Sequence, residues 1–168
     1  MYATQPGIVP VMERTNYQAS NCSIARTLDV VGEKWTLLIL RESFYGSTRF
    51  EQFRQVLECP RNVLSERLSK LVDEGILERS EYREPGSRTR NEYRMTDKGR
   101  ELVPILFALG EWGDRHKADL AGPPVIARHA GCGQDLRLTL RCAGGHEIAG
   151  PEDVEIVAGP GLLPLAPA

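Results

Sequence analysis

Four side chains in the last third of the chain have the types and spacing of metal ligands. They form the pattern His129-x2-Cys132 followed by Cys142-x3-His146. Two thiolates and two imidazoles match the tetrahedral ligand set that structural zinc sites use. Two interpretations stay open: a zinc ion held by these four residues, or a metal-free hairpin whose cysteines are free or close together. We expect no other cofactor.

A different thiol, that of Cys22, stands just before a periodic apolar segment. Backbone amides at a helix N-terminus stabilise a thiolate, so Cys22 is a candidate redox sensor. The alternative is a small apolar side chain buried near a dimer interface, because cysteine is among the most buried residue types.

The chain lacks the motifs of common enzyme classes. Its histidines, His116, His129 and His146, lie near no Ser or Cys in a nucleophile motif, and there is no Gly-rich phosphate loop. We therefore predict that the protein is not an enzyme.

The segment PRNVLSERLSKLVDEG has the pattern of a DNA-reading helix. Leu64, Leu68, Leu71 and Val72 fall on one helical face, and Gly75 ends the helix. Asn can bond adenine in a bidentate manner, and Glu can accept from cytosine N4. We predict base contacts from the polar face, by Asn62, Ser65, Glu66 and Ser69. We predict phosphate contacts from Arg49, Arg61, Arg67 and Lys70. The alternative is a polar face that is only solvated.

Three earlier segments must position this helix. Residues 23–31 and the apolar run KWTLLILRESFYG, which ends near Gly46, are predicted helices. Thr48 and Glu51 fit a capping box that starts a third helix, and Pro60 follows it. Its expected inner face consists of Phe50, Phe53, Val56 and Leu57. Two short helices joined by a tight turn form a helix-turn-helix.

A basic hairpin is expected next, with strands around Leu77–Arg83 and Asn91–Met95. Pro85-Gly86 between them is a type II turn signal. Narrow minor grooves attract arginine, so the wing contacts are predicted to be Arg83, Arg88 and Arg90. An ordinary solvated hairpin is the alternative, because glutamates dilute its charge.

A last helix opens at Thr96-Asp97, and Pro104 inside it predicts a kink. Its apolar stripe includes Ile105, Leu109 and Trp112. That stripe is longer than a small domain needs, which indicates a partner helix.

The predicted fold is mainly α with a small β-wing: a winged helix-turn-helix plus a small C-terminal, ribbon-like β-hairpin. Residues 1–20 are a predicted flexible arm, 21–117 the DNA-binding and dimerisation domain, and 118–168 a Gly/Pro-rich extension pairing Val125–Arg128 with Leu136–Cys142. The net charge of −2 means that DNA contact depends on local clusters of cations. The sequence predicts no membrane segment and no signal peptide, and we expect a cytoplasmic protein.

Residues 22 to about 116 resemble the HxlR family of winged-helix regulators. The matching motifs are Cys22 with Leu28, Val31 to Thr36, Gly46 with Arg49-Phe50 and Phe53, the three leucines of the DNA-reading helix, Gly75, Tyr93, Met95-Thr96 with Gly99, and Trp112-Gly113. Glu33 departs from the usual Gly or Asp. The early Cys and the Gly-x-Lys-Trp block argue against the related MarR type.

The resemblance implies a homodimer held by the N-terminal helix and the helix of residues 96–116. It also implies two DNA-reading helices on a palindromic operator. Several family members use a cysteine at the position of Cys22 to sense electrophiles or oxidants. Some longer members carry a second Cys-x2-Cys pair where this chain has Gly145.

The leading prediction is therefore a dimeric, sequence-specific transcriptional regulator that binds double-stranded DNA, its effector unknown. One alternative is a redox- or metal-responsive version that uses Cys22 or the Cys/His set. Another is a protein-interaction module that kept the winged fold without DNA binding.

Overall fold

The structure, a computed structural model, describes residues 20–83, 85–86 and 88–162. The predicted arm lies outside these residues except for its last member, Ser20. One compact unit is Thr27–Leu136, and the described residues on either side of it belong to a second. The predicted domain boundaries stay a prediction. In the described part of the chain, every helix is too short or too polar to cross a membrane.

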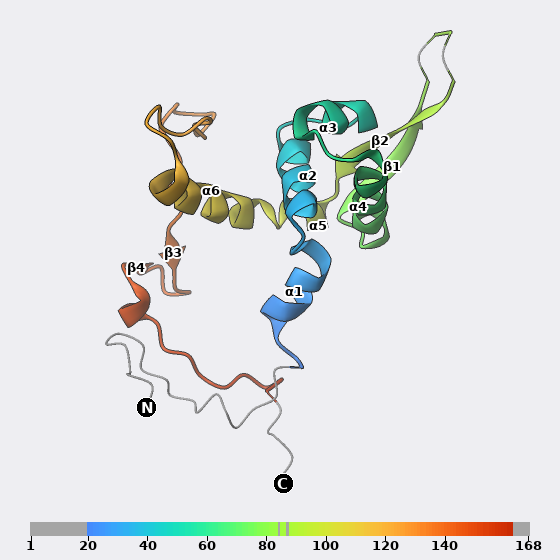
Figure 1. Ribbon diagram of the computed structural model, residues 1–168. Coiled ribbons are helices and arrows are strands. Elements are labelled where there is room, and N and C mark those ends of the chain that lie inside the picture. The colour runs from blue at the N-terminus through green and yellow to red at the C-terminus, as the bar shows by residue number, and fades with distance from the viewer. Residues whose placement is uncertain (1–19, 84, 87, 163–168) are drawn as a thin grey trace. The chain divides into compact units, whose positions relative to one another are not determined.

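Helix α2 (Lys34–Phe44) is the centre of the larger unit, and α1 (Ser23–Val31) precedes it. It packs against α3 (Phe50–Leu57), α4 (Arg61–Asp73) and α6 (Val103–Lys117) (Figure 1). The apolar run predicts this central position. The buried core side chains are Val31, Ile39, Leu40, Phe53, Leu57, Cys59, Leu64, Leu68, Leu71, Ile76 and Leu77.

Two glycines end helices for different reasons. Gly75 follows α4 with a φ of 66°, a left-handed conformation that favours glycine at a helix end, as predicted. Gly32, after α1, does not adopt positive φ. A Cβ at Gly32 would lie 2.5 Å from the Leu28 carbonyl oxygen, so close approach of the backbone requires glycine.

The start of α3 differs from the predicted capping box. Its N-cap is Arg49, one residue later than predicted, and the Gln52 side chain accepts from the amides of Thr48 (3.0 Å) and Arg49 (2.8 Å). The Glu51 side chain does not cap the helix and instead forms ion pairs with Arg54 and Arg61. Val56 was expected in the core, yet it is 56% exposed. The inner face of this eight-residue helix is therefore narrower than predicted, and its buried residues are Phe53 and Leu57.

Helices α3 and α4 are joined by the tight turn that the sequence indicates. Glu58 adopts φ 51° and ψ 28°, Cys59 is buried, and Pro60 caps α4. A residue with a Cβ is strained in this left-handed conformation. The strain persists because Cys59 and the flanking helices hold the turn.

The wing is a two-stranded antiparallel sheet of β1 (Leu77–Tyr82) and β2 (Arg90–Met95), in the register Leu77↔Met95. The Tyr93 amide donates to the Thr48 carbonyl at 2.7 Å, and Arg49 forms a bridge with Glu92. The loop before α3 thus fixes the base of the wing. Gly86 has φ 78°, as the predicted type II turn requires.

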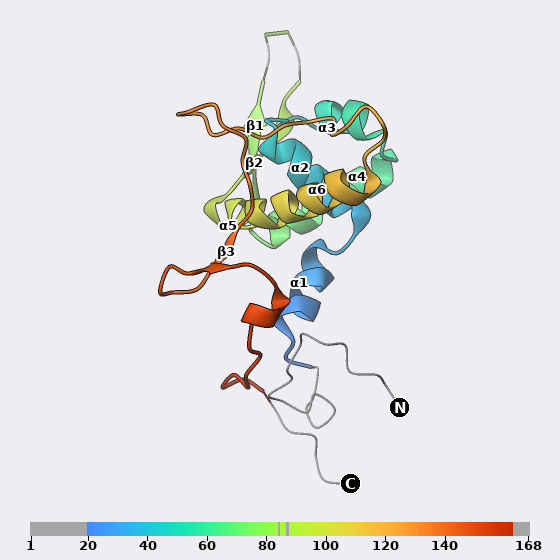
Figure 2. The same cartoon turned by 90° about the vertical axis from the view of Figure 1, so that its left-hand side faces the viewer.

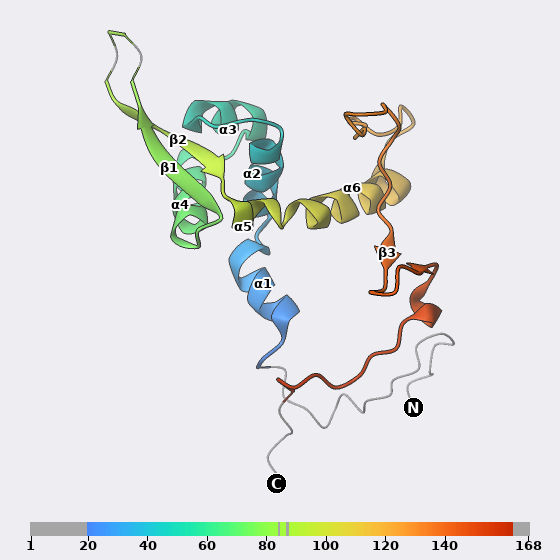
Figure 3. The same ribbon diagram turned by 180° about the vertical axis from the view of Figure 1, so that it is seen from behind.

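The last predicted helix is broken, not kinked, near Pro104. Residues Asp97–Arg100 form α5, and α6 begins at Val103 with the proline in its first turn. Proline is tolerated there because those amides lack intrahelical partners. Phe107 on α6 packs edge-on against Phe44 of α2, with ring centroids 5.6 Å apart. Figure 3 shows α6 leading away from α2 on the side opposite α4, and Figure 2 faces that side.

The extension contains less regular pairing than predicted. Arg128 bridges Asp135, but β3 (Leu140–Arg141) pairs with β4 (Glu147–Ile148) and not with residues 125–128. The predicted second strand is therefore split between two hairpins, and a 3-10 turn follows at Pro151–Asp153. The turn of each hairpin contains one Cys/His pair.

We predict opposite effects of two substitutions at the strained turn. Glu58→Val should lower the free energy of unfolding by about 1–2 kcal/mol, because a β-branched residue fits positive φ poorly. Glu58→Gly should be neutral or stabilising, since glycine adopts this conformation without strain. Urea denaturation of both variants checks this, and equal stabilities would contradict it.

Candidate nucleic-acid interface

The outward face of α4 consists of polar side chains. Asn62, Ser65, Glu66 and Ser69 are all exposed, while the three leucines of the opposite face are fully buried. Among the described residues, Asn62, Ser65 and Ser69 make no side-chain hydrogen bond, so their donors and acceptors face solvent. This face has the hydrogen-bonding groups that read base edges.

Arg61, at the start of α4, is shared with α3. Its guanidinium lies 3.3 Å from the Glu51 carboxylate and 5.0 Å from the Phe50 ring centroid. The side chain is still 74% exposed. A hydrogen bond from Arg54 lowers the pKa of Glu51, which keeps the carboxylate charged beside both arginines. Glu51 thus places Arg61 at the junction of the two helices.

Two other cations of α4 make contacts within the protein. Lys70 donates its Nζ proton to the Asp29 carbonyl at 2.6 Å. The Arg67 guanidinium lies 3.2 Å from Glu66 and 3.8 Å from Glu33, and its side chain is only 19% exposed. Both residues therefore face the α1–α2 junction.

Further cations lie around the wing. Arg49 lies over the Tyr82 ring at 4.5 Å, which joins the start of α3 to β1. The three predicted wing residues, Arg83, Arg88 and Arg90, are exposed. Figure 1 shows the base of the β1–β2 hairpin beside α4, with the hairpin extending outward past α3. The hairpin and the polar face of α4 thus belong to neighbouring elements.

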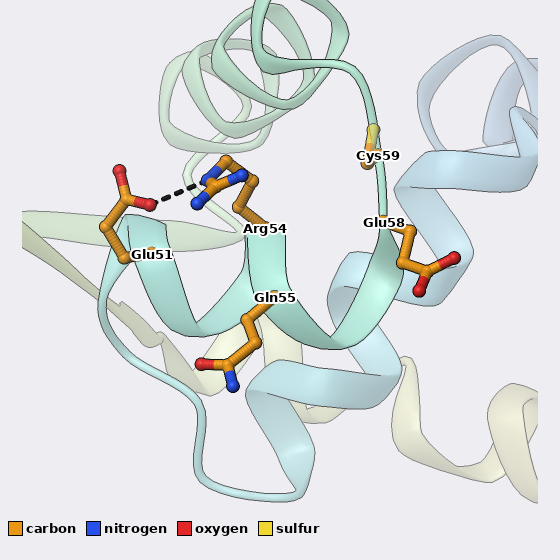
Figure 4. A pocket seen from close by; sticks show the side chains of 5 residues that line it. All are labelled: Glu51, Arg54, Gln55, Glu58 and Cys59. Carbon is orange, nitrogen blue, oxygen red and sulfur yellow. Dashed lines mark hydrogen bonds and ion pairs between the residues drawn. The ribbon is translucent and has the colours of Figure 1, made fainter.

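A hollow on the outer side of α3 is lined by Glu51, Arg54, Gln55, Glu58 and Cys59 (Figure 4). Arg54 and Glu51 pair across it at 2.7 Å. Burial raises the pKa of the Cys59 thiol, which keeps it protonated and unreactive at neutral pH. The hollow therefore lacks an activated nucleophile.

The Cys/His residues of the extension pair with a near neighbour in the chain, each pair within its own turn. His129 Nδ1 lies 3.2 Å from Cys132 Sγ, and Cys142 Sγ lies 3.5 Å from His146 Nδ1. All four side chains are exposed. Within the described ranges, no three His, Cys, Asp or Glu side chains gather as a metal site would require.

Cys22 immediately precedes α1 and is half-buried. Its carbonyl accepts from the Arg26 amide at 3.0 Å, so it occupies the N-terminal end of the helix, where the sequence predicts it.

Some contacts of the interface escaped the sequence reasoning. The i,i+3 spacing of Glu51 and Arg54 is a helical ion-pair signal that could have been found. The partners of Lys70 and Arg67 lie 41 and 34 positions away, and one of them is a backbone carbonyl that no residue type reveals.

Comparison with known proteins finds helix-turn-helix proteins both by family model and among individual sequences. The family model for HxlR-like helix-turn-helix proteins matches residues 30–120. A Mycobacterium tuberculosis (strain H37Rv) protein named as an uncharacterized HTH-type transcriptional regulator, Rv3095, is 41% identical over 140 residues. That match covers 83% of this chain and 87% of the relative.

Solved structures agree with the sequence relatives. The crystal structure of PA1607, a candidate transcription factor, has a TM-score of 0.73 at 35% identity and covers 83% of this chain and 96% of PA1607. The redox regulator HypR in its oxidised form has a TM-score of 0.53 at 31% identity, over 58% of this chain and all of HypR.

The family model covers more than half of the chain, and the match with the mycobacterial relative covers 83% of it. The winged helix-turn-helix fold predicted from the sequence is confirmed. The chain therefore belongs to the HxlR-like helix-turn-helix family of DNA-binding transcriptional regulators, and it is not an enzyme.

Proposed function

We propose that this regulator is sequence-specific and acts in the cytoplasm as a homodimer on a palindromic operator. The observation that carries the proposal is the outward face of α4, where the side chains of Asn62, Ser65 and Ser69 make no hydrogen bond within the described residues. Polar groups held on a rigid helix without internal partners can bond base edges in a major groove.

Base and phosphate contacts divide along this surface. Asn62 and Ser65 lie in the first turns of α4, the part of a recognition helix that reaches bases first, with Glu66 and Ser69 following on the same face. Arg61 and Arg49 flank it at the ends of α4 and α3, where phosphates pass. The wing arginines contact the adjacent minor groove or its phosphates.

The homodimer uses the apolar stripe of α6. None of its 15 residues is buried, and Ile105, Leu109 and Trp112 are 42%, 51% and 57% exposed. An added Cβ at Gly110 or Gly113 would meet nothing within 4 Å, so a second helix can approach closely. Exposed apolar side chains in one row favour burial against a partner. Because α6 and α4 lie on opposite sides of α2, dimerisation leaves the DNA-reading face open.

A redox-responsive version is the second candidate. The observation that favours it is the half-buried Cys22 at the start of α1, in a chain similar to the redox regulator HypR. A thiolate there is stabilised by the helix amides, and its oxidation alters the helix that leads into the core.

A metal-responsive version rests on the two Cys/His turns. Each presents one sulfur and one imidazole nitrogen on the surface, which are donors that zinc prefers. Metal analysis of the purified chain, beside a His129→Ala/Cys132→Ser variant, decides whether these turns bind zinc. The interaction-module alternative is decided by whether the purified chain binds DNA at all.

We predict that Arg88→Ala weakens binding to every DNA sequence. Losing one phosphate contact should reduce the slope of log K against log salt by about 0.9. Binding isotherms between 50 and 200 mM salt measure it. Arg137→Ala, which removes the same charge from the extension, is the matched control and should keep the wild-type slope. An unchanged slope in Arg88→Ala would remove this residue from the interface.

For the dimer, Trp112→Glu should produce monomers, because an unpaired carboxylate in an apolar interface costs several kcal/mol. Sedimentation velocity at several concentrations measures the change. Val56→Glu is the control, since Val56 is equally exposed, at 56%, but lies on α3. Dimers of unchanged affinity in Trp112→Glu would show that α6 is not the interface.

For the redox version, diamide should lower operator affinity roughly 5- to 150-fold, the range of allosteric coupling. Cys22→Ser should abolish this response, while Cys132→Ser should keep it. Mobility-shift titrations with and without diamide compare the three proteins. An equal response in Cys22→Ser would exclude Cys22 as the sensor.

A further inference from the structure

Two cations of the recognition helix are turned toward α1 and not toward the DNA-reading face. Lys70 donates to the Asp29 carbonyl at 2.6 Å. Since α1 ends at Val31, this carbonyl is among the last four of the helix, which lack intrahelical partners. A lysine there also offsets the negative end of the helix dipole. The contact therefore holds α4 to the C-terminus of α1.

Arg67 makes a second link, one turn earlier on α4. Its guanidinium lies between Glu66 and Glu33, and Glu33 is the N-cap residue of α2. Its Nε atom is buried, and the whole side chain is mostly covered. Reaching a phosphate would require Arg67 to leave both carboxylates. The α1–α2 junction thus contacts α4 at two successive positions on one side.

The leucines of α4 alone cannot fix the exact rotation of the helix about its axis. Burial of Leu64, Leu68 and Leu71 decides which face of α4 points outward, but apolar contacts are non-directional and constrain small rotations less tightly. Rotation about the helix axis moves every base-reading side chain, and such groups must be held to within about 0.5 Å. The hydrogen bond from Lys70 and the ion pair from Arg67, both to the junction, limit that rotation.

We propose that Lys70 and Arg67 are positioning residues that set the rotation of the recognition helix against the α1–α2 junction, and that neither contacts phosphate. The inference rests on the proposed operator binding. It assigns sequence discrimination partly to residues that touch no DNA, and it makes the position of α1 a determinant of how α4 meets the groove.

Lys70→Met in the full chain tests this assignment. The probes are a duplex selected by the wild-type protein from a random library and a scrambled duplex of equal length. We expect affinity for the selected duplex to fall about tenfold, affinity for the scrambled duplex to stay unchanged, and the salt slope to stay at the wild-type value. Lys117→Met, which removes a lysine from the end of α6, should change neither affinity.

Two results would overturn the proposal. One is a salt slope lowered by about 0.9 with equal losses on both duplexes, which is the signature of a lost phosphate contact. The other is unchanged discrimination between the duplexes in a folded variant. If the wild-type protein selects no sequence at all, the proposed operator binding fails, and this outcome is distinct from both.

Glu33→Gln provides the second test if Lys70→Met does not fold. Glu33 is 62% exposed, so its replacement leaves the core intact. Positioning predicts weaker discrimination with an unchanged salt slope, because Arg67 loses its anchor on the junction. A phosphate-binding Arg67 predicts instead unchanged discrimination and equally tighter binding to both duplexes, since the competing Glu33 carboxylate is removed.

Discussion

The burial of three leucines of α4 against the central helix is the constraint from which the rest of the interface follows. Leu64, Leu68 and Leu71 are fully buried, and a helix that buries this face must present the opposite one to solvent. The polar side chains of α4 are therefore exposed without any contact that pulls them outward. The same burial ties the α3–α4 turn so firmly that Glu58 is held in a left-handed conformation.

The positions of the cations near the interface matter more for DNA binding than the net charge of the chain. The net charge is −2, and several cations near the interface are engaged by neighbouring groups: Arg61 by Glu51, Arg67 by Glu33 and Glu66, and Lys70 by a backbone carbonyl. Attraction to phosphates therefore depends on the cations that stay exposed, which are the wing arginines and Arg61, whose side chain is 74% exposed despite its ion pair with Glu51. The engaged cations stiffen the frame that carries the reading face.

Helix α2 separates the polar face of α4 from the apolar stripe of α6. One of its sides packs against α4, and α6 leads away from the other (Figure 3). The helix breaks between α5 and α6, and Pro104 lies in the first turn of α6. The apolar stripe of α6 therefore lies on an element far from the polar face of α4.

The sequence by itself determined the periodic elements and their order. Spacing of the leucines on α4, the apolar run of α2 and the Pro85-Gly86 turn predicted a winged helix-turn-helix, because helix and strand periods depend on nearby residues. Tertiary structure decided what local patterns do not encode. Arg49 is the N-cap of α3, with Gln52 as its capping partner, and it also forms a bridge with Glu92 of the wing. Lys70 donates to a carbonyl 41 residues away. Such contacts join distant segments, and their geometry is fixed only when the core brings those segments together.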